Sequence, residues 1–89
     1  MAVTYTRDED IAMWGHTGSI FTLTGDGSDQ YVSLGGGTIR YVWLLSSGTN
    51  IGDLVRNSND GTEATSDGAV YFSGAALGNG AKAYIAVLF

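Results

Sequence analysis

The sequence predicts a small all-β protein, an antiparallel β-sandwich or barrel of about six strands joined by Gly-rich turns. Two observations support this fold class. Short segments rich in Val, Ile, Tyr, Phe and Thr recur along the chain, and no segment keeps a helical apolar spacing for more than one turn. Glycine accounts for 14 of the 89 residues, about twice the usual ~7%, and it clusters between those segments. A chain of this length is expected to form a single β domain over residues 1–89.

The predicted strands are residues 2–6, 19–24, 31–34, 38–46, 69–73 and 82–89. The acidic run at 8–10 is expected to end the first strand, and residues 11–14 fit either a helical turn or the start of a strand. The turn-forming cluster at 25–29 would join the second and third strands as a hairpin. Residues 50–55 fit a single helical turn, and the polar segment 56–63 is expected to be the most exposed and mobile part of the molecule.

Two predicted strands are apolar on both faces. In the segment 38–46, Val42 and Trp43 lie on opposite faces, and the segment 82–89 is similarly apolar up to Phe89. Such a strand is either central in a two-layer packing or pressed against a partner, and an apolar chain end is expected to be buried in one of these ways. We therefore expect an interface, with the candidate residues Trp14, Trp43, Tyr84, Ile85, Val87, Leu88 and Phe89.

The composition argues against several kinds of partner. The net charge is −5 and the four Lys and Arg residues are scattered, so we expect no nucleic acid partner and no docking to an anionic membrane. The absence of Cys excludes disulfides and thiolate metal sites, and a single His excludes a multi-His metal site within one subunit. The first residues lack the basic and apolar regions of a signal peptide, so synthesis in the cytoplasm is expected.

His16 is the candidate general base of the usual kind. Ser19 and the acids Asp8 and Asp10 are close in sequence, which makes a Ser/His/Asp arrangement arithmetically possible. No Gly-x-Ser-x-Gly elbow accompanies them, and His16 stands in a Gly-flanked segment typical of a turn. We expect a histidine that hydrogen-bonds locally or caps an interface.

Three loops were considered as ligand sites. Residues 26–29 and 57–63 are rich in oxygen donors, as calcium loops are, but neither matches the EF-hand register, and turn chemistry accounts for both. The glycines at 35–37 precede a strand with no Lys nearby, which does not suit a phosphate loop. All nine acids fall in turn-like or terminal segments. We expect no catalytic residue, no metal site and no cofactor, and we do not expect an enzyme.

The aromatic residues leave a second function open. Aromatic side chains make up 11% of the chain, and Trp14, Trp43, Tyr71, Tyr84 and Phe89 would suit a sugar-stacking platform as well as a core. A carbohydrate-binding β-sandwich module, with or without calcium, is therefore the alternative to a structural role.

In general style the sequence resembles the small accessory structural proteins of tailed-bacteriophage virions. It is short, acidic, rich in Gly, Ser and Thr, free of Cys, and it ends in an apolar segment. The resemblance covers the whole chain but lies in composition and pattern, so no functional residue is carried over. It implies a non-enzymatic capsid decoration or cement protein, or else a tail or fibre component, located in the virion. Such a protein would form homo-oligomers and bind capsid or other assembly subunits.

Overall fold

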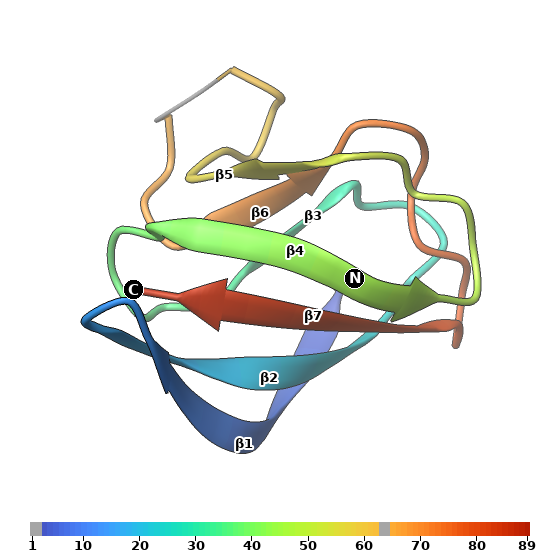
Figure 1. Cartoon of the computed structure of the whole chain (residues 1–89). Coiled ribbons are helices and arrows are strands. Elements are labelled where there is room, and N and C mark those ends of the chain that lie inside the picture. The colour runs from blue at the N-terminus through green and yellow to red at the C-terminus, as the bar shows by residue number, and fades with distance from the viewer. Residues whose placement is uncertain (1–2, 63–64) are drawn as a thin grey trace.

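Two antiparallel sheets that pack face to face make up the protein in our computed structural model, which describes residues 3–62 and 65–89 (Figure 1). The first sheet has the strand order β1-β2-β7-β4 and the second has the order β3-β6-β5. The strands are β1 (Thr4–Met13), β2 (His16–Thr24), β3 (Tyr31–Ser33), β4 (Tyr41–Ser47), β5 (Leu54–Arg56), β6 (Ala69–Phe72) and β7 (Lys82–Leu88). The predicted all-β fold class is confirmed. Of the two expected forms, sandwich and barrel, the described residues form a two-sheet sandwich, and they contain seven strands where about six were predicted. No helix long and apolar enough to cross a membrane occurs in the described residues.

The core lies between the inner faces of the two sheets. Phe21 and Ile85 from the first sheet and Val70 and Phe72 from the second are fully buried. Alternation along each strand produces this arrangement, since every second side chain points to the same face. Burial of one such side chain contributes about 1.5–3 kcal/mol, so these residues supply much of the stability of a small domain.

The central position of β7 explains why its sequence is apolar on both faces. This strand pairs with β2 on one side and with β4 on the other, so it has no free edge. The expectation that the C-terminal segment is buried holds within the chain's own core, where Ile85 and Val87 have no exposed area. The other doubly apolar segment behaves differently, because β4 is an edge strand.

The first strand is longer than predicted. The acidic residues Asp8, Glu9 and Asp10 do not end it, because they lie on an edge strand where their side chains reach solvent. A register shift between Arg7 and Glu9 accommodates the extra residue as a β-bulge. Residues 11–13 continue the strand, so the helical alternative for this segment is wrong.

Two further predictions are wrong because a local sequence pattern does not specify which distant segment a residue packs against or pairs with. The hairpin expected across residues 25–29 does not form, because β2 pairs with β1 and β7 while β3 pairs with β6 in the other sheet. The expected helical turn at 50–55 is instead a loop leading into β5. Ile51 is buried in the core and Leu54 pairs with Phe72, which accounts for the apolar spacing that suggested a helix.

The polar segment after β5 is partly buried, contrary to the prediction that it is the most exposed region. Asn57 has only 7% of its surface exposed, and its backbone φ is 55°. Its Nδ2 donates to the Ile39 carbonyl at 2.9 Å, and the Ile39 N–H donates to its Oδ1 at 2.8 Å. The side chain therefore pairs with the backbone of Ile39 as a strand would. Glu63, in the same segment, lies outside the described residues.

Candidate functional site

The candidate site is the outer face of the four-stranded sheet. Residues paired across antiparallel strands point to the same side of the sheet. The side that carries the core residues is the inner face, and the opposite side is the outer face. Ala86 pairs with both Ile20 and Trp43, Leu88 pairs with Tyr41, and these alternate along the strands with the core residues. The outer face therefore presents side chains from all three of β2, β7 and β4.

An aromatic cluster covers one end of this face. We define it as Trp14, His16, Tyr41 and Trp43. The Trp14 ring packs edge-on against Tyr41 with centroids 5.3 Å apart, and it lies 6.4 Å from Trp43. The His16 ring also packs edge-on against Tyr41, with ring centroids 5.7 Å apart. Edge-to-face contacts of this kind are favourable for aromatic rings and hold the cluster in a defined shape.

Trp14 occupies a demanding position in the backbone. It forms, with Gly15, the two-residue turn between β1 and β2, and their φ angles are 52° and 79°. Positive φ at both central positions is the type I′ hairpin, which favours Asn or Asp followed by Gly. A bulky side chain in this left-handed region costs about 1–2 kcal/mol. Trp14 is 68% exposed, so burial of the remaining part of the side chain at most balances that cost.

The face continues beyond the cluster as an apolar surface. Tyr84 on β7 and Leu45 on β4 are exposed by 41% and 49%. Charged groups lie toward other parts of the sheet: Thr22 donates to Asp8 on the β1 edge, and Lys82 Nζ donates to Thr24 Oγ1 at 2.7 Å at the far end of β7. The outer face also carries Glu9 of β1, which pairs with Ile20 in the same cross-strand row as Ala86 and Trp43, so the acids of this face lie at its β1 edge.

The structure brings together some of the predicted interface residues and separates others. Trp14 and Trp43 are in contact, and Tyr84 is exposed on the same face of the sheet. Ile85 and Val87 belong to the inner face and are fully buried, and Leu88 is fully buried although it pairs with the outer-face residue Tyr41. Ile85 and Val87 therefore belong to the core between the sheets, whereas Leu88 lies on the outer face without exposed area of its own. Phe89, also predicted, is half-buried beside Gly36 at the opposite side of the sheet.

Sequence reasoning missed other members of the face, namely Met13, Tyr41 and Leu45. His16, for which the sequence predicts a local hydrogen bond or a place at an interface, lies in the aromatic cluster. A signal for Tyr41 existed, because it alternates with Trp43 along the same strand. What the sequence did not reveal is the hairpin turn that places Trp14 against both rings.

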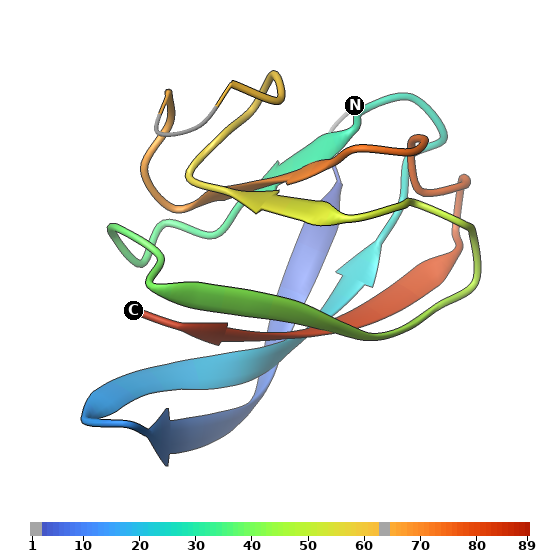
Figure 2. The ribbon, with the colours of Figure 1, turned by 45° about the horizontal axis from the view of Figure 1, so that its top comes forward.

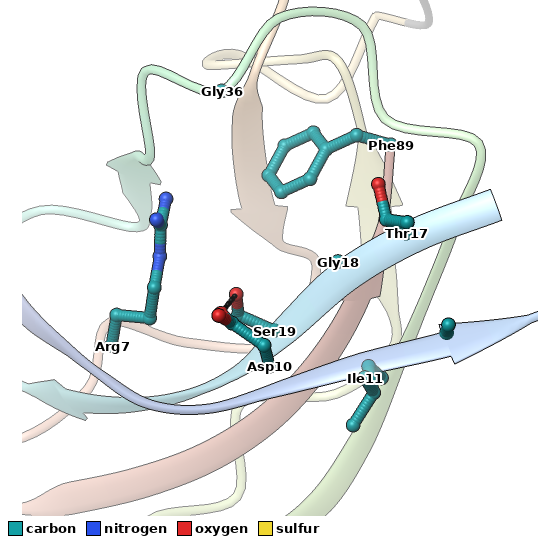
Figure 3. A pocket seen from close by; sticks show the side chains of 9 residues that line it. Arg7, Asp10, Ile11, Thr17, Gly18, Ser19, Gly36 and Phe89 are labelled. Atoms are coloured by element: carbon teal, nitrogen blue, oxygen red, sulfur yellow. Dashed lines mark hydrogen bonds between the residues drawn. The ribbon is translucent and has the colours of Figure 1, made fainter.

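A separate cavity of about 580 Å³ lies on the other side of the sheet, under the β1–β2 hairpin (Figure 3). Arg7, Asp10, Ser19 and Phe89 line it, and Ser19 Oγ donates to Asp10 Oδ1 at 2.9 Å. The Ser/His/Asp arrangement considered above does not form, because Ser19 and His16 lie three residues apart on one strand and so face opposite sides of the sheet. Within the residues that the structure describes, there is no group of three or more His, Cys, Asp and Glu side chains placed to hold a metal ion.

The two loops considered for calcium use their carboxylates in turns. Asp26 Oδ1 accepts the backbone N–H groups of Asp29 and Ser28 at 2.8 and 2.9 Å. Hydrogen bonds from these two N–H groups lower the pKa of Asp26 below its usual value. Asp60 similarly accepts the Thr62 N–H at 2.8 Å, which lowers the pKa of Asp60. Turn chemistry therefore accounts for both carboxylates.

Comparison with known proteins gives no match from which a function could be inferred, so the proposal below is argued from the structure. No family model, no curated protein and no solved structure matches the chain. The class defined by the fold and the site is a small β-sandwich with an exposed aromatic face on its four-stranded sheet.

Proposed function

We propose that the protein is a non-enzymatic structural subunit of a large assembly, which it joins through the outer face of the four-stranded sheet. The observation that carries the proposal is the position of Trp14. Its side chain is exposed and its backbone φ is 52°, so it contributes little to folding where Asn would fit better. A residue that violates a local rule with no net gain in the stability of the fold is best explained by a role outside the fold.

The size of the exposed face supports docking to another protein. Trp14, Tyr41 and Tyr84 are exposed by 68%, 45% and 41%. Since a buried aromatic side chain covers about 150–250 Å², the exposed parts of these rings together present on the order of 300 Å². The largest apolar patch of a typical monomer is about 300–600 Å², and such patches are often functional. Trp and Tyr are also the residues most enriched at the energetic centre of protein interfaces.

Within this class we propose a virion, where the protein would decorate or cement a capsid shell. The resemblance to phage accessory proteins supports this placement, as does the acidic charge of −5 with only 15% charged residues, which suits a partner surface that is neutral or basic. The partner would offer an apolar patch to the aromatic cluster.

Sedimentation of the native protein from a lysate of its source tests this proposal, with detection by mass spectrometry. We expect the protein to travel with particles of megadalton size. Purified protein added to particles that lack it should rebind, and Trp14→Asn should prevent rebinding. Recovery of the protein solely at the size of a monomer or small oligomer would refute the assembly role.

The second candidate is a carbohydrate-binding module, which the 68% exposure of the Trp14 ring favours. The rings of Trp14 and Tyr41 meet at 68° and so do not form a flat platform, which suits an apolar protein pocket better than a stacked sugar. Titration of Trp fluorescence with a broad set of glycans separates the two candidates. Quenching that saturates with one glycan, and is lost in Trp14→Asn, would favour the second.

A further inference from the structure

The two edges of the four-stranded sheet differ in their chemistry. The β1 edge carries Arg7, Asp8, Glu9 and Asp10 and has a bulge, two features by which natural proteins prevent edge-to-edge pairing. The β4 edge, Tyr41–Ser47, also has a register shift, between Leu44 and Ser46, but Tyr41–Leu44 before it is in regular register with β7, and the strand has neither Pro nor a charged residue. Its sequence of aromatic, β-branched and Leu residues has a high propensity to pair. The β1 edge is thus protected by charged residues, and the β4 edge lacks that protection.

The β4 edge borders an open seam between the two sheets. Figure 2 shows β4 (green) and β5 (yellow) beside each other on one side of the sandwich. In the described part of the chain, β4 pairs only with β7. Two open grooves of about 500 and about 400 Å³ lie along the seam, and Val42 and Leu54 line both. The seam is therefore accessible to another strand.

The seam is polarised along its length. Arg40 and Arg56 line the first groove, where the Arg56 guanidinium donates to the Arg40 carbonyl. Asp53 lines the second groove, beside Leu44. One end is thus positive and the other is negative. Two copies that meet head to tail along this seam would bring unlike charges together.

We propose that β4 pairs with β4 of a second copy of this chain, antiparallel and about a two-fold axis at Val42. The inference deepens the proposed function, on which it rests, by naming a second copy as one partner. In this register Arg40 of one copy lies opposite Leu44 of the other and next to its Asp53. Tyr41 lies opposite Trp43 on the outer face, a pairing of aromatic side chains that stabilises antiparallel strands. The aromatic face then continues from one copy to the next.

The acidic residues of β1 do not oppose this pairing. Neighbouring strands are about 4.8 Å apart, so β1 and its three acids lie about 14 Å from β4, farther than the Debye length of about 8 Å at physiological ionic strength. A dimer formed at β4 keeps the acidic edges of the two copies at its outer ends. Pairing at β1 would bring them together.

Sedimentation velocity of the purified full chain, from micromolar concentration to about 1 mM, tests the proposal. We expect a dimer of twice 9.3 kDa. Leu44→Lys places a charge in the middle of the edge and opposite Arg40, and it should raise the dimer dissociation constant at least about tenfold. Thr6→Lys, the matched substitution on the exposed β1 edge, should leave the constant unchanged.

A charge exchange tests the orientation. Asp53→Arg should weaken the dimer by about 2- to 30-fold, because each surface ion pair occurs twice by symmetry. The double variant Arg40→Asp with Asp53→Arg should restore it. Far-ultraviolet circular dichroism confirms that each variant is folded.

The outcomes separate this inference from the proposed function. A chain that is monomeric at about 1 mM, or a dimer insensitive to Leu44→Lys, would overturn the β4 pairing. A monomer that still sediments with large particles would overturn the β4 pairing but leave the proposed function in place. A dimer that is weakened by Leu44→Lys and by Asp53→Arg but never sediments with particles would support the pairing and refute the assembly role.

Discussion

Replacement of Trp14 by Asn separates the fold of this protein from its binding. In the type I′ turn, Asn adopts the positive φ of 52° more readily than Trp, which recovers about 1–2 kcal/mol. The substitution also removes the 32% of the Trp14 side chain that is covered, about 80 Å² or ~2 kcal/mol at 25 cal/mol per Å². The two effects nearly cancel, so the free energy of unfolding should change by no more than about 1 kcal/mol.

Binding should respond far more strongly. The exposed part of the Trp14 side chain is about 170 Å², and burying it against a partner would contribute up to ~4 kcal/mol. Truncation of an aromatic anchor costs about 2 kcal/mol or more, so Trp14→Asn should weaken the assembly contact at least about 30-fold. The predicted signature is a large loss of binding with a small loss of stability.

Two measurements check this prediction. Thermal unfolding should show a Tm within about 8 °C of the wild type, since 1 kcal/mol corresponds to about 4–8 °C in a domain of this size. Rebinding to depleted particles, measured as the concentration for half occupancy, should shift at least about 30-fold. Tyr71→Asn, which removes an aromatic ring from the outer side of the other sheet, serves as the control and should not affect rebinding. Unchanged rebinding by the Trp14 variant, or its failure to fold, would refute the reasoning.

The remaining predictions concern stability. Asn57→Ala should lower the free energy of unfolding by about 2–4 kcal/mol in urea, because it leaves the backbone groups of Ile39 buried without partners. Gly18→Ala should lower the free energy of unfolding by about 3 kcal/mol or more, because a Cβ at this position would lie 1.8 Å from a β7 carbonyl oxygen. Gly48→Ala is the control, since its Cβ would lie 3.5 Å from the nearest atom, and it should unfold like the wild type in the same urea titration. The folded-state pKa of Asp26 is below 3.8. The stability that its ionised form contributes is therefore present above pH 3.8 and is lost as the pH falls through the folded-state pKa. In acid titrations the stability advantage of the wild type over Asp26→Asn should shrink as the pH falls below 3.8.

The fold class was predictable because it depends on a property that each segment carries alone. Alternation and Gly-rich breaks identified the segments of β2, β4, β6 and β7. Pairing was not predictable in the same way. The cluster at 25–29 suits a hairpin, but Asp26 caps a turn there that directs the chain to the other sheet, and nothing local distinguishes the two outcomes.

The candidate site was predictable only in part. The part that was not predicted is the turn at Trp14, where the residue type does not match the local backbone preference. Trp43 and Tyr84 are aromatic residues of predicted strands, so sequence reasoning found them. The hairpin at Trp14 was missed because Trp is a poor residue for a type I′ turn, and propensity gives it no weight there. Disagreement between local preference and structure is most frequent at functional sites, and here it coincides with the most exposed aromatic side chain.

The exposed apolar residues are not a consequence of an incomplete core. A folded monomer of 9.3 kDa is expected to expose about 5,000 Å², and this chain exposes 4662 Å². The interior between the sheets is already filled by side chains such as Phe21, Phe72 and Ile85, none of which has exposed area. Trp14 and Tyr41 therefore keep much of their surface exposed on a face that the second sheet does not cover. The β1 edge is protected by charged residues, whereas the β4 edge is uncharged and lies next to the apolar face. A subunit with these features can contact other subunits on one side only.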